Sequence, residues 1–300
     1  MSTTRKLWLG LAALLVTSFA VLLWVGSVVH QQAPPLPTAV VTSDGQTLYT
    51  RADMEEGRQV WQSIGGQQLG SIWGHGALLA PDWSADWLHR ESMAMLDLLA
   101  RDEGLGPYES LDAQQQAPLK ARVQEELRTN PYDAASNTIT VSALRAHAME
   151  AVAAHYMSLF GNDPATHKLR EGYAMRENTV AEMEHRREVT AFFWWTSWAA
   201  ATQRPNEPMS YTQNWPYEPL AGNAPTSTSF LWSVFSILFM IFGIGLLGWH
   251  HARQVSHEPL PPIPARDPLT EMKATPSMKA TGKYFWTVLA LFLAQILLGA

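Results

Sequence analysis

The chain contains three long apolar segments, which alternate with polar stretches. They are Leu7 to Val29, Phe230 to Trp249 and Tyr284 to Ala300, and none of them contains a charged residue. A helix of the first segment's length spans roughly 34 Å, enough to cross a hydrocarbon core of about 30 Å. We therefore expect three transmembrane helices, the first of them retained as an anchor rather than removed as a signal peptide.

These segments define the expected boundaries of the chain's parts. They are a cytoplasmic N-terminus at 1–6, a first span at 7–29, a polar domain at 30–229, a second span at 230–249, a loop at 250–283 and the start of a third span at 284–300. The third segment stays apolar to its last residue and contains Gln295. Because a hydrogen-bonding side chain in a bilayer usually faces another helix, we expect further membrane helices beyond Ala300.

Basic residues give the expected orientation of the spans. Arg5 and Lys6 precede the first span, and the loop at 250–283 carries five Lys or Arg residues, so both parts are expected in the cytoplasm. The domain at 30–229 is then periplasmic. It has 14 basic and 24 acidic residues, a net charge of −10 with neutral histidines. This charge argues against nucleic acid or anionic lipid as a partner of the domain.

Helical periodicity dominates the polar domain, so the predicted fold class is a mainly α membrane protein. Helices are expected to begin near Asp53, Ser84, Ala117, Ser142 and Thr179, with Asp53 and Ser84 as caps. The last helix, to about residue 202, is too short to span a bilayer and is expected to be buried or to lie at the membrane surface. Residues 65–81 predict a tight glycine-rich loop, 204–225 predict coil, and 137–141 predict at most one short strand.

The sequence contains no cysteine, and this decides whether the chain can attach a c-type haem. Residues 59–91 look like a cytochrome-c-type segment, with four tryptophans among glycines. Covalent attachment of a c-type haem requires two thiols beside a histidine, in the order Cys-x-x-Cys-His. The domain is therefore expected to hold no c-type haem.

Histidines and carboxylates provide weak candidates for metal binding. His75 lies between two glycines, and a hydrogen-bonded histidine that fixes its loop is a simpler interpretation than a haem ligand. Glu182 and His185 have the Glu-x-x-His spacing of di-iron bundles, but the single copy favours a solvated charged turn. The other candidates are His147 and His155, roughly 12 Å apart along one helix, and the interfacial His250, His251 and His257. On local chemistry alone we assign no reaction.

Five features are more specific together than any one of them alone. They are the N-terminal anchor, the signature at 61–91 with its Gly-Ser-Ile-Trp-Gly-His-Gly core, the Phe-Phe-Trp-Trp block at 192–195, the Asn-Trp-Pro-Tyr-Glu-Pro motif at 214–219 and the Tyr-Phe-Trp opening of the third span. With these features the chain resembles the N-terminal part of single-subunit, quinol-dependent nitric oxide reductase, a member of the haem–copper oxidase superfamily.

The resemblance implies a haem-free, cytochrome-c-like periplasmic domain joined to a helical bundle in the bacterial inner membrane. By this resemblance, the parent protein is expected to reduce two nitric oxide molecules to nitrous oxide with electrons from membrane quinol. Its haem b and non-haem iron are held by later helices, so their ligands lie beyond Ala300 and no catalytic residue is assigned in this chain. The chain alone is expected to be inactive, with the lipid bilayer and the remaining helices as partners.

The resemblance also implies a calcium ion between the glycine-rich loop and the haem propionates. The family's ligands in this loop are a backbone carbonyl in a Gly-Ala segment and a tyrosine two residues further on. Gly76 matches the carbonyl position, whereas Leu78 stands where some relatives have the tyrosine. Gly76 is therefore the metal ligand expected in this chain.

Two other functions stay open at the level of sequence. A periplasmic sensor or assembly module without catalysis would also place an acidic domain between two spans. Sensors normally enter a cytoplasmic signalling helix after the second span, whereas here a Pro-rich stretch at 259–264 leads into a third apolar segment. A haem-binding oxygen reductase of the same superfamily would differ only in residues outside this chain.

Overall fold

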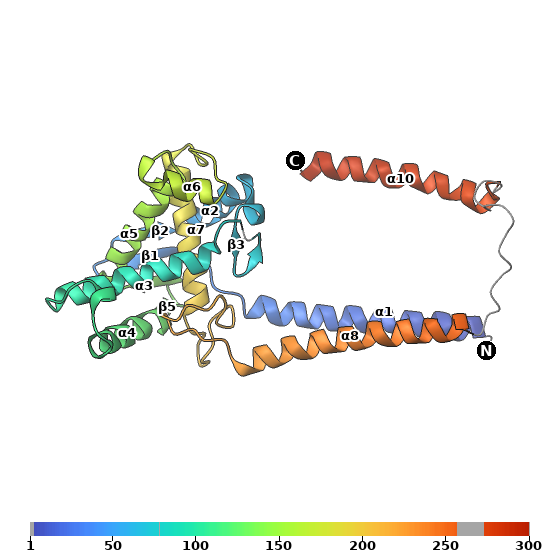
Figure 1. Cartoon of the computed structure of the whole chain (residues 1–300), viewed down its shortest axis with the longest axis horizontal. Helices are drawn as coiled ribbons and strands as arrows, with labels where there is room; N and C mark the ends of the chain where they lie inside the picture. The colour runs from blue at the N-terminus through green and yellow to red at the C-terminus, as the bar shows by residue number, and fades with distance from the viewer. Residues whose placement is uncertain (1–2, 78, 257–272, 300) are drawn as a thin grey trace. The chain divides into compact units, whose positions relative to one another are not determined.

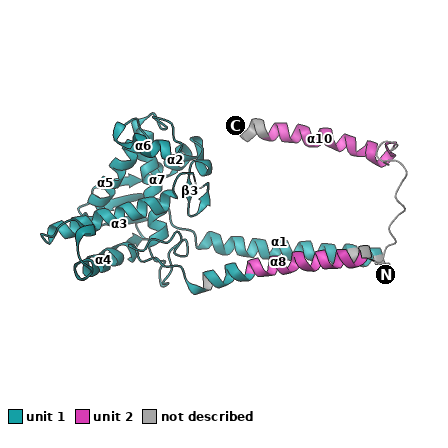
Figure 2. Cartoon of the chain, viewed as in Figure 1, with its two compact units in different colours: residues 1–235 teal, residues 236–300 magenta. Residues whose placement is uncertain are grey.

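The computed structural model describes residues 3–77, 79–256 and 273–299. The chain divides into two compact units, Met1–Phe235 and Ser236–Ala300 (Figures 1 and 2). The first unit contains the whole polar domain, α1 and the first residues of α8. Leu78, His257 and the Pro-rich stretch at 259–264 lie outside the described residues.

The chain is mostly helical, as its periodicity predicts. The α-helices are α1 (Thr3–Gln31), α2 (Arg51–Ser63), α3 (Trp83–Asp102), α4 (Ala113–Arg128), α5 (Ala143–Leu159), α6 (His167–Gly172), α7 (Met183–Ala201), α8 (Ser227–Ser256) and α10 (Pro276–Gly299). Three short 3₁₀ helices are η1 (Gly66–Gln68), η2 (Tyr108–Ser110) and η3 (Pro164–Thr166). Helices α2 to α7 make up most of the polar domain (Figure 1).

The one short strand expected at 137–141 is present, but the sequence did not predict the sheet to which it belongs. β6 (Thr138–Val141) occupies the predicted segment, but it belongs to a four-stranded sheet with β1 (Ala39–Thr42), β2 (Thr47–Thr50) and β5 (Tyr132–Asp133), in the order β2-β1-β6-β5. β1 and β6 are parallel, with Val40 opposite Ile139. Each strand has at most four residues, too few to show a period, and the parallel partner lies far away in sequence.

The helix starts show which capping signals the sequence indicated correctly. Helix α5 is capped by Ser142, as expected. Helix α2 begins earlier than expected, because Thr50 is its cap and Asp53 completes a capping box three residues into the helix. Helix α3 is capped by Asp82 rather than by Ser84. Helix α4 begins at Ala113, where Asp112 and Gln115 form a second capping box.

Helix α7 lies at the centre of the domain, and α2, α3 and α5 pack against it (Figure 1). Phe193 and Trp194 of its aromatic block are fully buried, so this helix belongs to the core and not to the membrane surface. α2 and α7 approach closely at Gly57, where an added Cβ would overlap the backbone carbonyl of Glu188. Two clusters of buried apolar residues result, one around α7 with α2 and α5, and one between α3 and α4.

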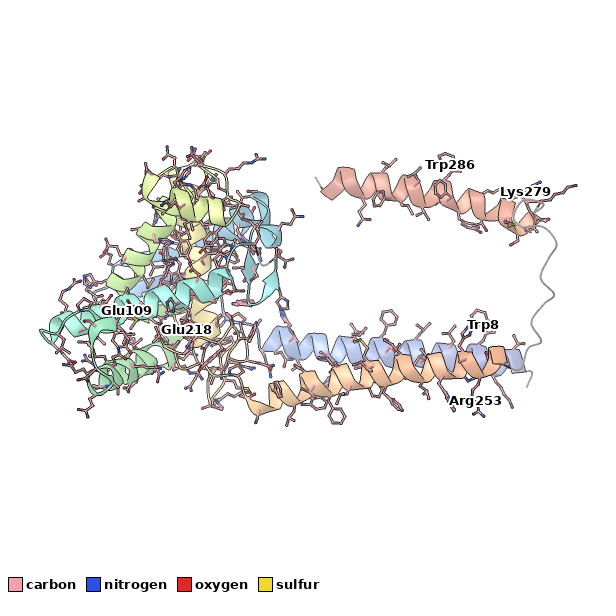
Figure 3. The ribbon with its side chains drawn as sticks, viewed as in Figure 1. Trp8, Glu109, Glu218, Arg253, Lys279 and Trp286 are labelled. Carbon is pink, nitrogen blue, oxygen red and sulfur yellow. The ribbon has the colours of Figure 1, made fainter. Side chains whose placement is uncertain are left out.

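Two of the described helices are long and apolar enough to cross a membrane, by length and composition. They correspond to Thr4–Gln31 in α1 and Phe230–Gln254 in α8. Large apolar side chains such as Trp8 in α1 and Trp286 in α10 are exposed along the apolar helices (Figure 3). α10 is helical but is not among the candidate spans of the described residues, so a count of three spans is not supported.

The ends of the later helices also differ from the sequence-based boundaries. α8 continues to Ser256, so His250 and His251 lie on a helix at the beginning of the segment that the sequence assigns to a cytoplasmic loop. α10 begins at Pro276, before the apolar run that opens at Tyr284. The polar residues at these ends can continue a helix past its apolar stretch. Hydropathy marks where the apolar stretch ends, but it does not mark where the helix ends.

Candidate functional site

The glycine-rich loop is a hairpin held by one carboxylate. Its strands β3 (Ser71–Ile72) and β4 (His75–Gly76) are antiparallel. Asp82 Oδ2 accepts hydrogen bonds from Ser71 Oγ at 2.8 Å and from the Gly74 N–H at 2.6 Å. Asp82 Oδ1 accepts a third from the Ala85 N–H at 3.0 Å, which caps α3. The hairpin and the start of α3 are therefore fixed to each other through Asp82.

Gly76, the expected metal ligand, lies on the exposed second strand of this hairpin. Its φ of +149° and its position against Gly70 and Ser71 leave no room for a Cβ. The next residue is anchored as well, because the Ala77 N–H donates to Gln67 O at 2.6 Å. The backbone at Gly76 is thus held in one conformation that a side chain would not permit.

Trp73 connects the hairpin to the core. Its Nε1–H donates to Thr196 O on α7 at 2.8 Å, and its ring lies 5.6 Å from that of Trp195 at an angle of 50°. Trp73 has a φ of +53°, which turns the chain so that Gly74 packs directly on the indole of Trp215. Tryptophans and glycines occur close together in this part of the sequence, and the structure gives the reason. Because Gly70 and Gly74 have no side chain, an indole can pack directly against each of them.

His75 lines a cavity of about 770 Å³ beside this hairpin. Trp73, Tyr211 and Trp215 form its aromatic walls, and residues from the end of α1 and the start of α8 complete it. His75 is exposed, and no other histidine or methionine is among the described residues that line this cavity. The geometry therefore offers no pair of axial ligands for a haem at His75.

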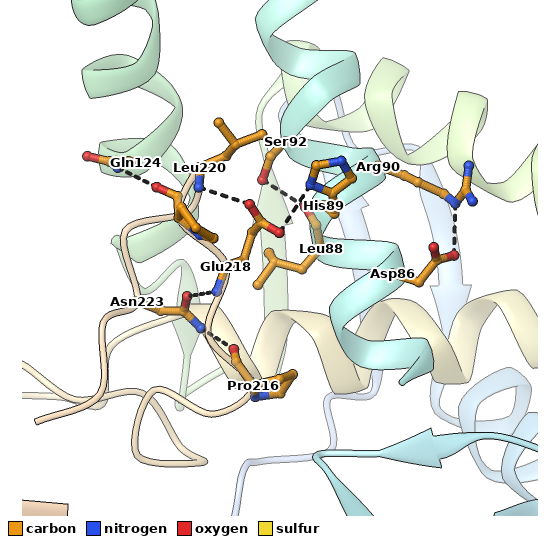
Figure 4. A network of polar contacts seen from close by, with 11 residues as sticks. Asp86, Leu88, His89, Arg90, Ser92, Gln124, Pro216, Glu218, Leu220 and Asn223 are labelled. Atoms are coloured by element: carbon orange, nitrogen blue, oxygen red, sulfur yellow. Dashed lines mark hydrogen bonds and ion pairs between the residues drawn. The ribbon is translucent and has the colours of Figure 1, made fainter. Parts of the chain in front are cut away.

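The coil before α8 is anchored on α3 and α4 by Glu218 and its neighbours (Figure 4). Glu218 Oε2 lies 3.1 Å from His89 Nδ1, and its Oε1 accepts the Leu220 N–H at 3.0 Å. Asn223 closes the coil on itself, accepting the Glu218 N–H at 2.8 Å and donating to Pro216 O at 2.8 Å and to Ala200 O at 3.0 Å. The Asn-Trp-Pro-Tyr-Glu-Pro motif therefore fixes the coil that carries Trp215.

Aromatic side chains fill the interior of the domain. Trp83 stacks on Phe193 at 5.3 Å and 8°, and Trp87 stacks on Tyr156 at 5.2 Å and 4°. The Tyr156 hydroxyl donates to Asp86 Oδ2 at 2.6 Å, and burial raises the pKa of Tyr156 well above its ordinary value. These rings occupy the centre of the fold and supply large apolar area together with specific ring contacts.

A fully buried ion pair lies at the edge of this aromatic core. Arg145 Nε donates to Glu91 Oε1 at 2.7 Å, with 1% and 0% of the two side chains exposed. Trp87 Nε1–H donates to Glu91 Oε2 at 3.0 Å, and the Arg145 guanidinium lies 5.9 Å from the ring of Trp194. Burial raises the pKa of nearby Tyr49 to about 12, with a partly opposing hydrogen bond to Thr190. The sequence did not reveal this pair, because its partners are 54 residues apart.

Among the residues that the structure describes, the other candidate histidines do not come together at one site. At the start of α7, His185 Nδ1 lies 3.5 Å from Glu182 Oε2 and His185 Nε2 lies 3.9 Å from Glu188 Oε2. His147 is exposed and its Nδ1 is 2.8 Å from Ala143 O, while burial lowers the pKa of His155. Among the described residues, no group of three or more His, Cys, Asp or Glu side chains is arranged to hold a metal ion.

These observations describe a mostly helical domain with an aromatic interior, connected at both ends to helices long enough to cross a membrane. Residues 37–217 match the family model for the cytochrome c-like domain of the NorB polypeptide of nitric oxide reductase. The match covers more than half of the chain, so the chain belongs to this family. A comparison with curated proteins finds no match.

Proposed function

We propose that this chain is the N-terminal part of a quinol-dependent nitric oxide reductase of the bacterial inner membrane. The parent reaction is 2 NO + 2 e⁻ + 2 H⁺ giving N₂O and H₂O. The observation that carries the proposal is a cytochrome-c-like domain of this family in a sequence without cysteine. Because such a domain has no thiols to attach a haem, electrons enter the parent protein by another route, and membrane quinol is the donor that the proposal names.

The chain's own role in this proposal is structural. Its interior is packed with aromatic rings, and its hairpin tip and the cavity beside it lie next to residues of α1 and α8. Outside the apolar helices, Leu79, Met183, Trp215 and Tyr217 are the large apolar residues that are exposed in the described part of the chain. Leu79 and Trp215 belong to the hairpin loop and to the coil that packs on it, so this surface is the one expected to receive the remaining membrane helices.

In such a reductase, haem b and non-haem iron would be held by helices beyond Ala300, and α10 would be the start of a third span. Arg5 and Lys6 before the apolar run of α1, and Arg253 near the end of α8, support cytoplasmic ends and a periplasmic domain. Haem b supplies electron transfer when it is bound. The residues of this chain would form the surface against which the helices that hold haem b pack.

Calcium at Gly76 is a subordinate part of the proposal. A calcium ion takes six to eight oxygen ligands. Gly76 offers one backbone carbonyl, and the nearby Asp82 carboxylate already accepts three hydrogen bonds. The described residues do not complete a calcium site, so any such site takes most of its ligands from outside this chain.

The experiment is quinol-driven consumption of nitric oxide by the protein expressed from the whole gene. We expect turnover with a reduced quinol and none with reduced cytochrome c as the sole donor. Turnover with cytochrome c alone would refute the quinol donor, and absence of nitric oxide consumption would refute the reductase. The 300-residue chain purified by itself should show no Soret absorption, and stoichiometric bound haem would contradict a haem-free domain.

A further inference from the structure

Met183, at the start of α7, is an exposed apolar residue that the proposed function does not use. Its exposed fraction is 71%, and the other large exposed apolar residues of the described polar domain lie in the hairpin loop or in the coil near it. Met183 lines a groove of about 940 Å³ that is bounded by α5, by the start of α7 and by the turn between β1 and β2. We call it the α5–α7 groove. Exposed apolar residues beside a groove are typical of a surface that binds a partner.

The α5–α7 groove is elongated, because its lining follows one face of α5. Positions 143, 146, 147, 150, 153 and 157 of α5 line it, at the spacing of three or four that keeps side chains on one face of a helix. This stretch of helix is about 21 Å long. On the other wall, Met183, Arg187 and Thr190 of α7 follow the same spacing. An occupant that contacts both walls is therefore long and narrow, like a helix of about four turns.

The lining is apolar and adaptable. Three of its residues are methionines, Met149, Met157 and Met183, and three are alanines. Methionine side chains adapt to the shape of an apolar partner and are common on surfaces that bind amphipathic helices. The short alanine side chains leave room for the side chains of a partner. The lining thus favours the apolar face of a helix over a small polar ligand.

The rim of the groove carries more negative than positive charge. Asp44, Glu150 and Glu184 line it as exposed carboxylates, against the one guanidinium of Arg187. Within the described part of the chain, Glu150 and Glu184 form no ion pair, and Arg187 Nη2 donates to Leu48 O at 3.2 Å. A partner with basic residues beside its apolar face would balance this rim.

An extended peptide fits the groove less well than a helix. β2 is the edge strand of its sheet, and its residues Leu48 and Tyr49 line the groove. However, the strand has only four residues, and the Leu48 carbonyl already accepts a hydrogen bond from Arg187. Addition of a further strand needs free backbone groups along the edge, so the groove favours a helix.

We propose that the α5–α7 groove binds a basic amphipathic helix of a partner protein. The apolar face of that helix lies on the methionines, and its Lys or Arg residues lie beside Asp44, Glu150 and Glu184. This inference goes beyond the proposed function and does not depend on nitric oxide reduction, because it rests on side chains of the described domain alone.

The test measures peptide binding to the whole 300-residue chain in phosphatidylcholine nanodiscs by fluorescence anisotropy. The probe is a labelled peptide of Leu and Lys, about four turns long and apolar on one face, and nanodiscs without the protein are the blank. A scrambled peptide of the same composition and a peptide with Glu in place of Lys are the controls. We expect saturable binding of the probe, at least roughly tenfold weaker binding of the scrambled peptide and none of the acidic one.

Paired charge variants locate the binding. Glu150→Gln with Glu184→Gln should weaken binding of the probe roughly fivefold, because it removes two rim carboxylates. Glu55→Gln with Glu125→Gln is the matched control, since both residues are exposed and lie outside the lining, and it should change the affinity by less than about twofold. Equal effects of the two pairs would show general attraction to an acidic domain and would overturn the proposed site.

Met183→Ser tests the apolar contact without disturbing the fold. We expect roughly tenfold weaker binding of the probe and an unchanged melting temperature, because this side chain is already 71% exposed. Leu79→Ser, an equally simple change on the exposed hairpin loop, should leave the affinity unchanged. Absence of binding, or equal binding of the scrambled peptide, would overturn the proposal. Self-association of the chain that Met183→Ser abolishes, without binding of the probe, would place a second copy on the groove and would also overturn it.

Discussion

The buried pair of Glu91 and Arg145 gives the sharpest prediction about stability. Replacing Arg145 with Met leaves the Glu91 carboxylate fully buried, with the Trp87 indole N–H as its one remaining hydrogen-bond partner among the described residues. Removing one partner of a buried ion pair typically costs about 3–5 kcal/mol of unfolding free energy, because the remaining charge stays desolvated. For a domain of this size that loss corresponds to a decrease of about 10 °C in the melting temperature.

The double variant Glu91→Gln with Arg145→Met tests the cause of this loss. The glutamine side chain would keep an oxygen that can accept the Trp87 N–H, while the methionine removes the guanidinium, whose two Nη atoms have no hydrogen-bond partner among the described residues. We expect the double variant to recover most of the stability lost in Arg145→Met, because no unpaired charge is left in the interior. The two substitutions should therefore be strongly non-additive, with a coupling free energy of about 2–3 kcal/mol.

Thermal unfolding of the purified chain in detergent, followed by the fluorescence of its 13 tryptophans, measures all of these variants. Arg122→Met is the control, because Arg122 pairs with Glu103 on the surface with about half of both side chains exposed. We expect it to change stability by less than about 1 kcal/mol. If Arg145→Met melts within about 2 °C of the original chain, or if the double variant is as unstable as the sum of the singles, the pair does not have the energetics inferred here.

Three further predictions concern other parts of the domain. Gly57→Ala should destabilise the chain by about 3 kcal/mol, because its Cβ would push α2 away from α7, whereas Gly172→Ala, with open space around it, should change stability by less than about 1 kcal/mol. Gly76→Ala should cost about 3 kcal/mol, from both strain and overlap, against about 1 kcal/mol for Gly104→Ala, which has a positive φ but no neighbour within 4 Å. Thermal unfolding measures both pairs, and equal melting temperatures within either pair would contradict the packing described. Because burial lowers the pKa of His155 from its ordinary 6.5, the unfolded chain takes up its proton first as the pH falls, so stability is lost below about pH 6.5. His155→Gln should show a smaller drop in melting temperature between about pH 7 and about pH 5, and an unchanged drop would count against this assignment.

The sequence predicted the helices well where they are long and strongly periodic. α3, α5 and α7 fall close to their expected ranges, because a helix of 17 to 20 residues repeats its apolar face several times. The helix starts were less reliable. Asp53 and Ser84 are good capping residues, but in each case a residue two or three positions earlier, Thr50 or Asp82, makes the capping bond.

Contacts between distant residues could not be predicted. β1 and β6, each of four residues, pair in parallel although the α-helices α2, α3 and α4 lie between them in the sequence. The Glu91 to Arg145 pair and the packing of Gly74 on Trp215 are likewise long-range. The sequence indicated that residues 61–91 are special through their Trp and Gly content, but only the fold shows that the cavity beside His75 takes its walls from a coil near residue 215.

The three hydrogen bonds of Asp82 have a consequence for motion in the loop. Because the same carboxylate holds Ser71, the tip residue Gly74 and the first turn of α3, the exposed tip cannot loosen without also fraying a helix that reaches into the core. Amide protons at the tip should then exchange with solvent in step with those of the first turn of α3, as one cooperative opening unit. The exposed hairpin should therefore open as rarely as the buried start of α3. A surface that opens this rarely is preformed for any partner that packs on it.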